Sequence, residues 1–277
     1  MNPPADIRLL LADVDGTLVT QEKVLTEAAI AAAGELRAQG VTLALTSGRP
    51  PRGMQMLVAP LALTGAIAGF NGGVFVNPDL SVIDSHVLDP KVAKQALAVI
   101  ADHGLDGWLY TVDDWLVTAP EAPHVAREAW TVKFEPHVVG SFTDAQFTQA
   151  VKIVGVSDDH ARVAACERDM QAALGAQASA ARSQPYYLDV THPQANKGAV
   201  VDRLSKLLDI PRGQIATIGD MPNDVLMFRR SGFSFAMGNA DDEVKAAANA
   251  TVASNEQEGF AQAVRSLLAA QAGRKRA

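Results

Sequence analysis

Apolar residues near the start of the chain form two short, nearly continuous runs, Ile7–Ala12 and Val41–Leu45, separated by an alanine-rich segment. Runs of this length that end at polar residues are typical of strands buried on both faces of a parallel sheet. The alanine-rich segment begins at Thr26, a suitable N-cap residue, and ends at Gln39, directly before Gly40. This order predicts a strand–helix–strand unit with parallel strands.

The last third of the chain shows the same alternation of short apolar runs and helical patterns. We therefore predict an α/β fold whose core domain is a Rossmann-like parallel sheet. In this part the predicted strands are Ile215–Ile218 and Phe233–Ala236, and the predicted helices are Gly198–Leu208, Asp224–Arg230, Asp242–Ala248 and Gly259–Ala270.

The middle of the chain differs, because strands outnumber helices there and all three Trp and all three Tyr lie between residues 108 and 187. We predict an α+β domain of residues 84–190, a cap inserted into a core formed by residues 1–83 and 191–277. The predicted strands are Val82–Val87, Trp108–Val112, Trp115–Thr118, Val151–Val156 and Tyr186–Thr191, with helices at Lys91–Asp102 and Asp159–Leu174.

Composition narrows the class of protein. A hydrophobic fraction of 48% with 20% charged residues excludes disordered and fibrous chains. The single cysteine, Cys166, excludes an intrachain disulfide and a multi-cysteine metal site. The net charge of −7 argues against a broad nucleic-acid interface. Asp13 and Asp15 interrupt the N-terminal apolar region, and the longest apolar stretch, residues 57–70, is too short to span a bilayer. We therefore expect a cytoplasmic protein with no membrane or nucleic-acid partner.

The first chemical motif, Asp13-Val14-Asp15-Gly16-Thr17, directly follows the first predicted strand. Ligand sites of open α/β sheets lie just beyond the carboxyl ends of the strands, so the position of these carboxylates matters as much as their identity. A calcium loop of the EF-hand type is excluded, because it needs glycine and glutamate where this chain has Leu18 and Val24.

Three further segments beyond strands carry matching chemistry. Thr46 and Ser47 supply hydroxyls of the kind that bind phosphate oxygens, Lys197 opens a helix, and Asp220 and Asp224 follow another strand. Each motif alone is also typical of an ordinary turn or helix start. Together they predict a site for Mg²⁺ and a phosphate group.

The segments DVDGTLV, LTSGR, NKG and GDMPND, in this order, resemble the four motifs of the haloacid dehalogenase-like (HAD) phosphatase superfamily. Arg49 and Lys197 are 148 residues apart, which resembles the Cof-type branch with its large α/β cap inserted between the second and third motifs. Phe70-Asn71-Gly72-Gly73 and Met237-Gly238-Asn239-Ala240 also look like signatures of that branch.

The resemblance implies a role for each matching residue. Asp13 would be the nucleophile, and Asp15 would protonate the leaving oxygen and later accept a proton from water. Thr46 and Lys197 would bind the phosphoryl oxygens. Mg²⁺ would be held by the Asp13 carboxylate, the Asp15 carbonyl and Asp220, with support from Asn223 and Asp224. The weaker substrate-binding candidates are Ser47, Gly48, Arg49, Asn71 and Gly72.

These roles predict a Mg²⁺-dependent phosphatase that hydrolyses small phosphomonoesters through an aspartyl-phosphate. A phosphomutase that uses the same intermediate and a non-catalytic sugar-phosphate sensor are alternatives. We expect a small phosphorylated metabolite as the partner, and a monomer or homodimer. Residues 84–190 contain 8 basic and 15 acidic side chains, so the cap carries the net negative charge of the chain. Because the cap of this family type contacts the substrate, a negative cap predicts a preference for monophosphates with neutral, hydroxyl-rich bodies, such as sugar phosphates, over bisphosphates and nucleoside polyphosphates. The alternative is that these carboxylates lie on the outer face of the cap and serve only solubility.

Overall fold

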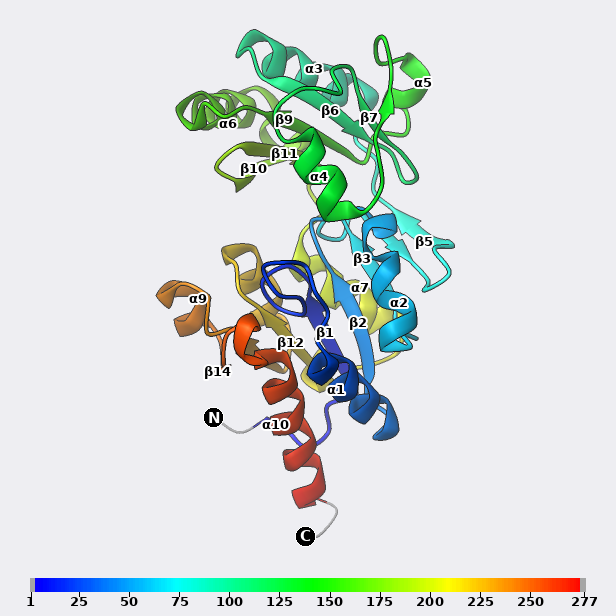
Figure 1. Ribbon diagram of the computed structural model, residues 1–277, viewed down its shortest axis with the longest axis vertical. Helices are drawn as coiled ribbons and strands as arrows, with labels where there is room; N and C mark the ends of the chain where they lie inside the picture. Colours follow the sequence, from blue (N-terminus) through cyan, green and yellow to red (C-terminus); the bar gives the residue numbers. More distant parts are fainter. Residues whose placement is uncertain (1–2, 275–277) are drawn as a thin grey trace.

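The computed structural model describes residues 3–274 and contains two sheets, one above the other in Figure 1. The larger sheet has the strand order β14-β13-β12-β1-β2-β3-β4-β5. Neighbours from β14 to β3 pair in parallel, and β4 and β5 are antiparallel. Its strands are β1 Leu9–Asp13, β2 Thr42–Thr46, β3 Ile67–Gly69, β4 Val74–Val76, β5 Val82–Ser85, β12 Ile215–Gly219, β13 Phe233–Ala236 and β14 Ala250–Thr251.

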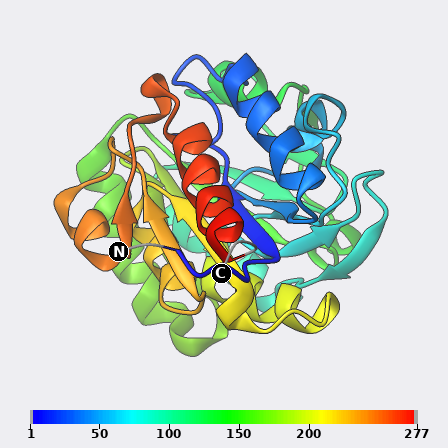
Figure 2. The same cartoon turned by 90° about the horizontal axis from the view of Figure 1, so that it is seen from below.

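Helices cover both faces of this sheet, because the apolar runs of β1 and β2 point side chains alternately to either side. Leu10 and Leu43 pack with α1, α2 and α10, whereas Leu9 and Ala44 pack with α7, α8 and α9. Figure 2 shows α10 beside α1 on one face. These helices are α1 Glu27–Ala38, α2 Gln55–Leu61, α7 Lys197–Leu207, α8 Val225–Phe228, α9 Asp242–Ala247 and α10 Gly259–Arg274.

The smaller sheet forms the cap, with the strand order β10-β11-β9-β6-β7-β8. Its outer face packs on α3 and α6, and Cys166 of α6 is fully buried there, as expected of a small core residue. Its strands are β6 Asp106–Tyr110, β7 Trp115–Val117, β8 His137–Val138, β9 Lys152–Val156, β10 Ser179–Gln184 and β11 Tyr187–Thr191, and its helices are α3 Pro90–Asp102, α4 Val125–Val132, α5 Asp144–Phe147 and α6 His160–Leu174.

One predicted strand lies in the other sheet, and one predicted helix is shorter than expected. Val82–Val87, grouped by sequence with the middle strands, corresponds to β5 of the larger sheet, where Asp84 pairs with Phe75 of β4. The side chains of β5 are partly exposed and its sequence mixes polar and apolar residues, so the sequence did not indicate which strand it pairs with. Asp224–Arg230 is not a single helix, because a 3₁₀ turn at Pro222–Asp224 precedes the short α8. The boundaries at 83/84 and 190/191 stay a prediction.

The cap contacts the core through aromatic side chains. The ring of Phe70, at the end of β3, lies 5.5 Å from that of Tyr110 on β6. Arg52, in the 3₁₀ helix Pro51–Met54, lies 4.6 Å from the ring centre of Phe134. The inner face of the cap sheet therefore faces the carboxyl ends of β1 to β3.

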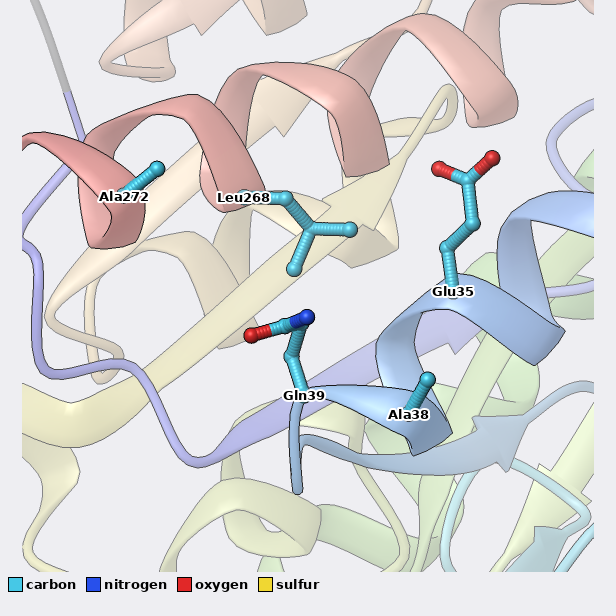
Figure 3. A pocket seen from close by; sticks show the side chains of 5 residues that line it. All are labelled: Glu35, Ala38, Gln39, Leu268 and Ala272. Carbon is cyan, nitrogen blue, oxygen red and sulfur yellow. The ribbon is translucent and has the colours of Figure 1, made fainter.

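A shallow pocket of about 350 Å³ lies between α1 and α10 and is lined by Glu35, Ala38, Gln39, Leu268 and Ala272 (Figure 3). Gln39 caps the end of α1 that leads into the start of β2, so this pocket is at the opposite edge of the sheet from the predicted site. In the described part of the chain, no helix is long and apolar enough to cross a membrane.

Candidate active site

The site is built on the carboxyl end of β1. Asp13 is the last residue of this strand and lies in register with Thr46, the last residue of β2. On the other side, Ala12 pairs with Ile218, which brings Gly219 and the following acidic loop level with Asp13. Parallel pairing thus gathers three of the sequence motifs at one edge.

Lys197 joins the fourth motif to the first. Asn196 caps α7 by accepting a hydrogen bond from the Ala199 N–H, which sets Lys197 as the first helical residue. The Lys197 ammonium donates to Asp13 Oδ1 and to Asp224 Oδ1, both at 2.6 Å. Burial lowers the pKa of Lys197, but the two carboxylates outweigh this and raise it above its ordinary value. Lys197 is therefore a permanent cation that fixes both aspartates.

Asp13, Asp220 and Asp224 form an acidic cluster in which each offers an oxygen within 4.8 Å of the others. Burial, opposed by Lys197, raises the pKa of Asp13 well above its usual range. Burial and then the charge of Asp224 raise the pKa of Asp220 to about 6. Carboxylate oxygens are the ligands that Mg²⁺ prefers, and a divalent cation would offset the repulsion that lifts these pKa values. The donor set therefore fits Mg²⁺.

Asp224 has a second function in the acidic loop. Its Oδ2 accepts hydrogen bonds from the backbone N–H groups of Asp220 and Met221. This is possible because Gly219 has no side chain: a Cβ there would lie 2.3 Å from Asp224 Cγ. Asp224 thus shapes the loop that presents Asp220. Asn223 is exposed, and its side chain makes no hydrogen bond to any described residue.

Two neighbours orient the Asp220 carboxylate. The Thr17 hydroxyl donates to Oδ1 at 3.2 Å, and the Asn239 amide donates to Oδ2 at 3.2 Å and to the Gly16 carbonyl at 2.9 Å. Gly16 has φ +80°, and a Cβ there would lie 2.3 Å from Asp220 Oδ2. The turn after β1 therefore needs glycine for its conformation and for the close approach of Asp220.

Asp15 points to two cations instead of the acidic cluster. Arg49 makes a bidentate contact with it, Nε to Oδ2 at 2.7 Å and Nη2 to Oδ1 at 2.6 Å, and Lys23 Nζ lies 2.7 Å from Oδ1. Burial raises the pKa of Asp15, but hydrogen bonds and charge from Arg49, helped by Lys23, outweigh it and lower the pKa to about 2. Asp15 is thus ionised in this arrangement.

The hydroxyl of Thr46 is fully buried and has no hydrogen-bond partner in the described chain. Asn71 Oδ1 is likewise buried and unpartnered. The loops that carry them are joined, because the Asn71 N–H donates to the Ser47 carbonyl at 2.7 Å, and Asn71 and Gly72 both have positive φ. Buried polar atoms without partners are rare in proteins, so these two mark a place for a polar ligand beside Asp13.

The structure thus brings Asp13, Thr46, Lys197, Asp220 and Asp224 together and gathers the 47–49 and 71–72 loops beside them. It leaves Asn223 outside and directs Arg49 to Asp15. Sequence reasoning missed Thr17, Lys23 and Asn239. Thr17 and Asn239 stand inside motifs that were recognised, whereas Lys23 had no signal, because only the turn from Thr20 to Val24 brings it back to Asp15.

The sequence matches the haloacid dehalogenase-like hydrolases over residues 10–264. The chain belongs to this family. It is 27% identical over 271 residues to a pyridoxal phosphate phosphatase of Escherichia coli, and the aligned region covers 94% of this chain and 98% of the relative. A haloacid dehalogenase-like hydrolase from Bacteroides thetaiotaomicron superposes with a TM-score of 0.86 at 26% identity, covering 94% and 98% of the two chains.

A sugar phosphatase of HAD subclass IIB has the same fold, with a TM-score of 0.80 at 21% identity over 93% of this chain and 98% of its own. The resemblance to haloacid dehalogenase-like hydrolases is thereby confirmed, and the fold with its α/β cap is that of a subclass IIB member. Family membership and the relatives named as phosphatases make this chain a phosphoric monoester hydrolase.

Proposed function

We propose that this protein is a Mg²⁺-dependent phosphatase that hydrolyses small phosphomonoesters through an aspartyl-phosphate on Asp13. The observation that carries the proposal is the contact of Asp13 with Lys197 at 2.6 Å, beside the unpartnered Thr46 hydroxyl and within an acidic cluster. A buried ammonium and a free hydroxyl suit the oxygens of a phosphoryl group.

In the first step a carboxylate oxygen of Asp13 attacks phosphorus and the ester P–O bond breaks. Lys197 holds Oδ1, which leaves Oδ2 for the attack. Asp15 gives a proton to the leaving alcohol. In the second step water attacks the aspartyl-phosphate, Asp15 takes its proton, and inorganic phosphate leaves. When bound by Asp13 and Asp220, Mg²⁺ supplies positive charge that offsets repulsion between the carboxylate and the phosphate.

Proton donation by Asp15 requires a change from the arrangement described above. A carboxylate with a pKa of about 2 is a poor acid near neutral pH. Loosening of the Arg49 and Lys23 contacts would raise that pKa. We propose that this loosening accompanies substrate binding, when Arg49 can interact with the anionic phosphate instead.

The proposed substrates are small phosphorylated metabolites, as pyridoxal phosphate is for the Escherichia coli relative by its name. Among them we propose monophosphates with uncharged, hydroxyl-rich bodies, such as sugar phosphates. Net cap charge gives limited support, because nine of the fifteen acidic side chains of residues 84–190 are exposed. Stronger support comes from Glu128 and Asp189, two carboxylates that contact side chains on the inner face of the cap sheet.

The test is release of inorganic phosphate from a panel of phosphomonoesters under multiple turnover. We expect activity with Mg²⁺, its loss after chelation with EDTA, and its return when Mg²⁺ is added. Asp13→Asn should remove turnover of every substrate, because no acyl phosphate can form. Full activity after exhaustive chelation would contradict the metal requirement, and a phosphoryl group returned to a sugar would indicate a mutase.

The role of Asp15 has a separate test. In single-turnover experiments, Asp15→Asn should slow alkyl phosphates much more than p-nitrophenyl phosphate, because nitrophenolate leaves without a proton. Equal losses for the two leaving groups would mean that Asp15 is not the acid.

A further inference from the structure

The inner face of the cap sheet carries an unusual set of side chains. Cross-strand pairing places Tyr110 opposite Trp115 and Lys152, and it places Trp108 and Asp189 opposite the same residue of β9. The polar and aromatic members of this face include Trp108, Tyr110, Trp115, Lys152, Tyr187 and Asp189. It faces the catalytic sheet, because Tyr110 contacts Phe70 at the end of β3, and the Tyr110 hydroxyl donates to Glu128 of α4.

Four polar atoms on this face are buried without a hydrogen-bond partner among the described residues. They are Nε1 of Trp108, Nε1 of Trp115, the Tyr187 hydroxyl and Asp189 Oδ1. With the two at Thr46 and Asn71, six of the eight such atoms lie at the site or on the cap face opposite it. Leaving such an atom dry and unpaired destabilises the folded protein. Their concentration here indicates that a polar ligand satisfies them.

Asp189 is held for such a contact. Lys152 Nζ lies 2.8 Å from its Oδ2, and both side chains are only about one-tenth exposed. The ammonium balances the charge of the carboxylate and fixes its orientation, while Oδ1 has no partner. Oδ1 can therefore accept a hydrogen bond from a ligand donor.

The aromatic rings offer their N–H edges. The rings of Tyr110 and Trp115 are nearly parallel with centroids 5.8 Å apart, and Trp108 packs edge-on against Trp115 and Tyr187 at 5.1 and 5.4 Å. The indole N–H groups of Trp108 and Trp115 are buried and have no partner among the described residues. A hydroxyl group accepts from an indole N–H and donates to a carboxylate, so hydroxyl groups suit this combination.

We propose that Asp189 is a specificity-determining residue for the non-phosphate part of the substrate. Its Oδ1 accepts a hydrogen bond from a hydroxyl of the substrate, while the indole N–H groups of Trp108 and Trp115 donate to other oxygens of the same molecule. This rests on the proposed phosphatase function and names the residues that select the body of the substrate.

The test compares Asp189→Asn with wild type on ribose 5-phosphate, glucose 6-phosphate and p-nitrophenyl phosphate. In the variant, Lys152 takes the amide oxygen and an NH₂ group replaces Oδ1, so a donor stands where an acceptor is needed. We expect kcat/KM for the better sugar phosphate to fall about tenfold or more, mainly through KM, and that for p-nitrophenyl phosphate to change less than about twofold. Asp113→Asn, at an exposed cap carboxylate, should change neither.

Trp108→Phe and Trp115→Phe provide a second pair of variants, because they keep a buried aromatic ring and remove the N–H together with part of the indole, and turnover of p-nitrophenyl phosphate reports any general effect of the smaller ring. Each should lower kcat/KM for the sugar phosphate selectively. The proposal would be overturned by equal losses of kcat/KM on all three substrates or by no loss in any variant. It would also be overturned if the wild-type protein hydrolysed p-nitrophenyl phosphate but neither sugar phosphate.

Binding separates this inference from the proposed function. Binding of the two sugar phosphates can be measured by calorimetry on Asp13→Asn and on the double variant Asp13→Asn/Asp189→Asn, because this needs no turnover. The double variant should bind the better sugar phosphate about tenfold more weakly than Asp13→Asn does. Equal affinities would overturn the role of Asp189. A wild-type chain that releases no phosphate would instead overturn the proposed function.

Discussion

At the scale of single residues, the surroundings of the site shift the pKa values of Asp13 and Asp15 in opposite directions, although the two residues are only two positions apart in the sequence. Asp13 lies among other acids with one buried ammonium, and its pKa is raised because burial dominates. Asp15 lies between Arg49 and Lys23, and its pKa is lowered to about 2. Opposite shifts on neighbouring carboxylates are typical of groups that perform different steps of one reaction.

Lys23→Met should raise the pKa of Asp15, because one of its two cations is removed. We expect an increase of up to about one unit, measured by carboxyl ¹³C NMR titration. Lys91→Met, at an exposed lysine of α3, is the control and should leave this pKa unchanged. An unchanged value in Lys23→Met would mean that Arg49 alone lowers it.

Asp220 should make the metal-free protein less stable as the pH rises from about 4 to 6. Its pKa is about 6 in the folded chain against 3.8 ordinarily, so the folded state binds the extra proton in this window and loses that advantage as the proton leaves. This loss in the free energy of unfolding amounts to roughly 1–3 kcal/mol. In urea unfolding, the stability of Asp220→Asn relative to wild type should therefore increase from pH 4 to 6 and then level off.

Asp113→Asn should show no such trend, and Mg²⁺ should stabilise wild type more at pH 7 than at pH 5. A constant difference between Asp220→Asn and wild type across this window would contradict the raised pKa.

At the scale of elements, the turn after β1 determines where the acidic loop can lie. Leu18 and Val19 both donate to the Val14 carbonyl, which coils the chain tightly around Gly16. The positive φ of Gly16 and its contact with Asp220 leave no room for a side chain.

Gly16→Ala should displace Asp220 and reduce Mg²⁺ affinity and kcat/KM at least tenfold, because the added methyl group would overlap the carboxylate. The measurements are Mg²⁺ calorimetry and phosphate release. Gly34→Ala is a matched control in α1, where a Cβ meets no other atom. It should leave both quantities unchanged and raise stability by about 0.5–1 kcal/mol. Wild-type Mg²⁺ affinity in Gly16→Ala would show that the turn adapts.

At the scale of the whole molecule, the chain passes between the two sheets twice, and a histidine follows the strand at each crossing. His86 comes after β5 and His192 after β11, and their rings stack with centroids 5.2 Å apart. Burial, and then the charge of His86, lower the pKa of His192. The two crossings are thus joined by a contact that protonation would oppose.

The contribution of His192 to thermal stability should be lost as the pH falls through about 6.5, since a folded state with a depressed His192 pKa resists the proton that the unfolded chain accepts. His192→Gln should lose less over the same range, measured as the unfolding temperature from pH 8 to pH 5. His160→Gln, at an exposed histidine of α6, should follow wild type. Identical pH profiles for His192→Gln and wild type would contradict this prediction.

The sequence by itself determined the parallel α/β core and most of its site. Continuous apolar runs such as those of β1 and β2 can be buried only on both faces of a sheet, and parallel pairing then places whatever follows each strand at one edge. Asp13, Thr46 and Asp220 follow such strands, and Lys197 begins a helix with a recognisable cap, so their meeting could be predicted from local patterns.

Tertiary structure alone decided the remaining features, because they depend on contacts between segments with no periodic signal. β5 became an edge strand of the core through pairing with β4. Arg49 and Lys23 reached Asp15 through irregular loops. The unpartnered atoms on the cap face arise from the register of several strands, and register is set by packing across the whole sheet and not by any one strand's sequence.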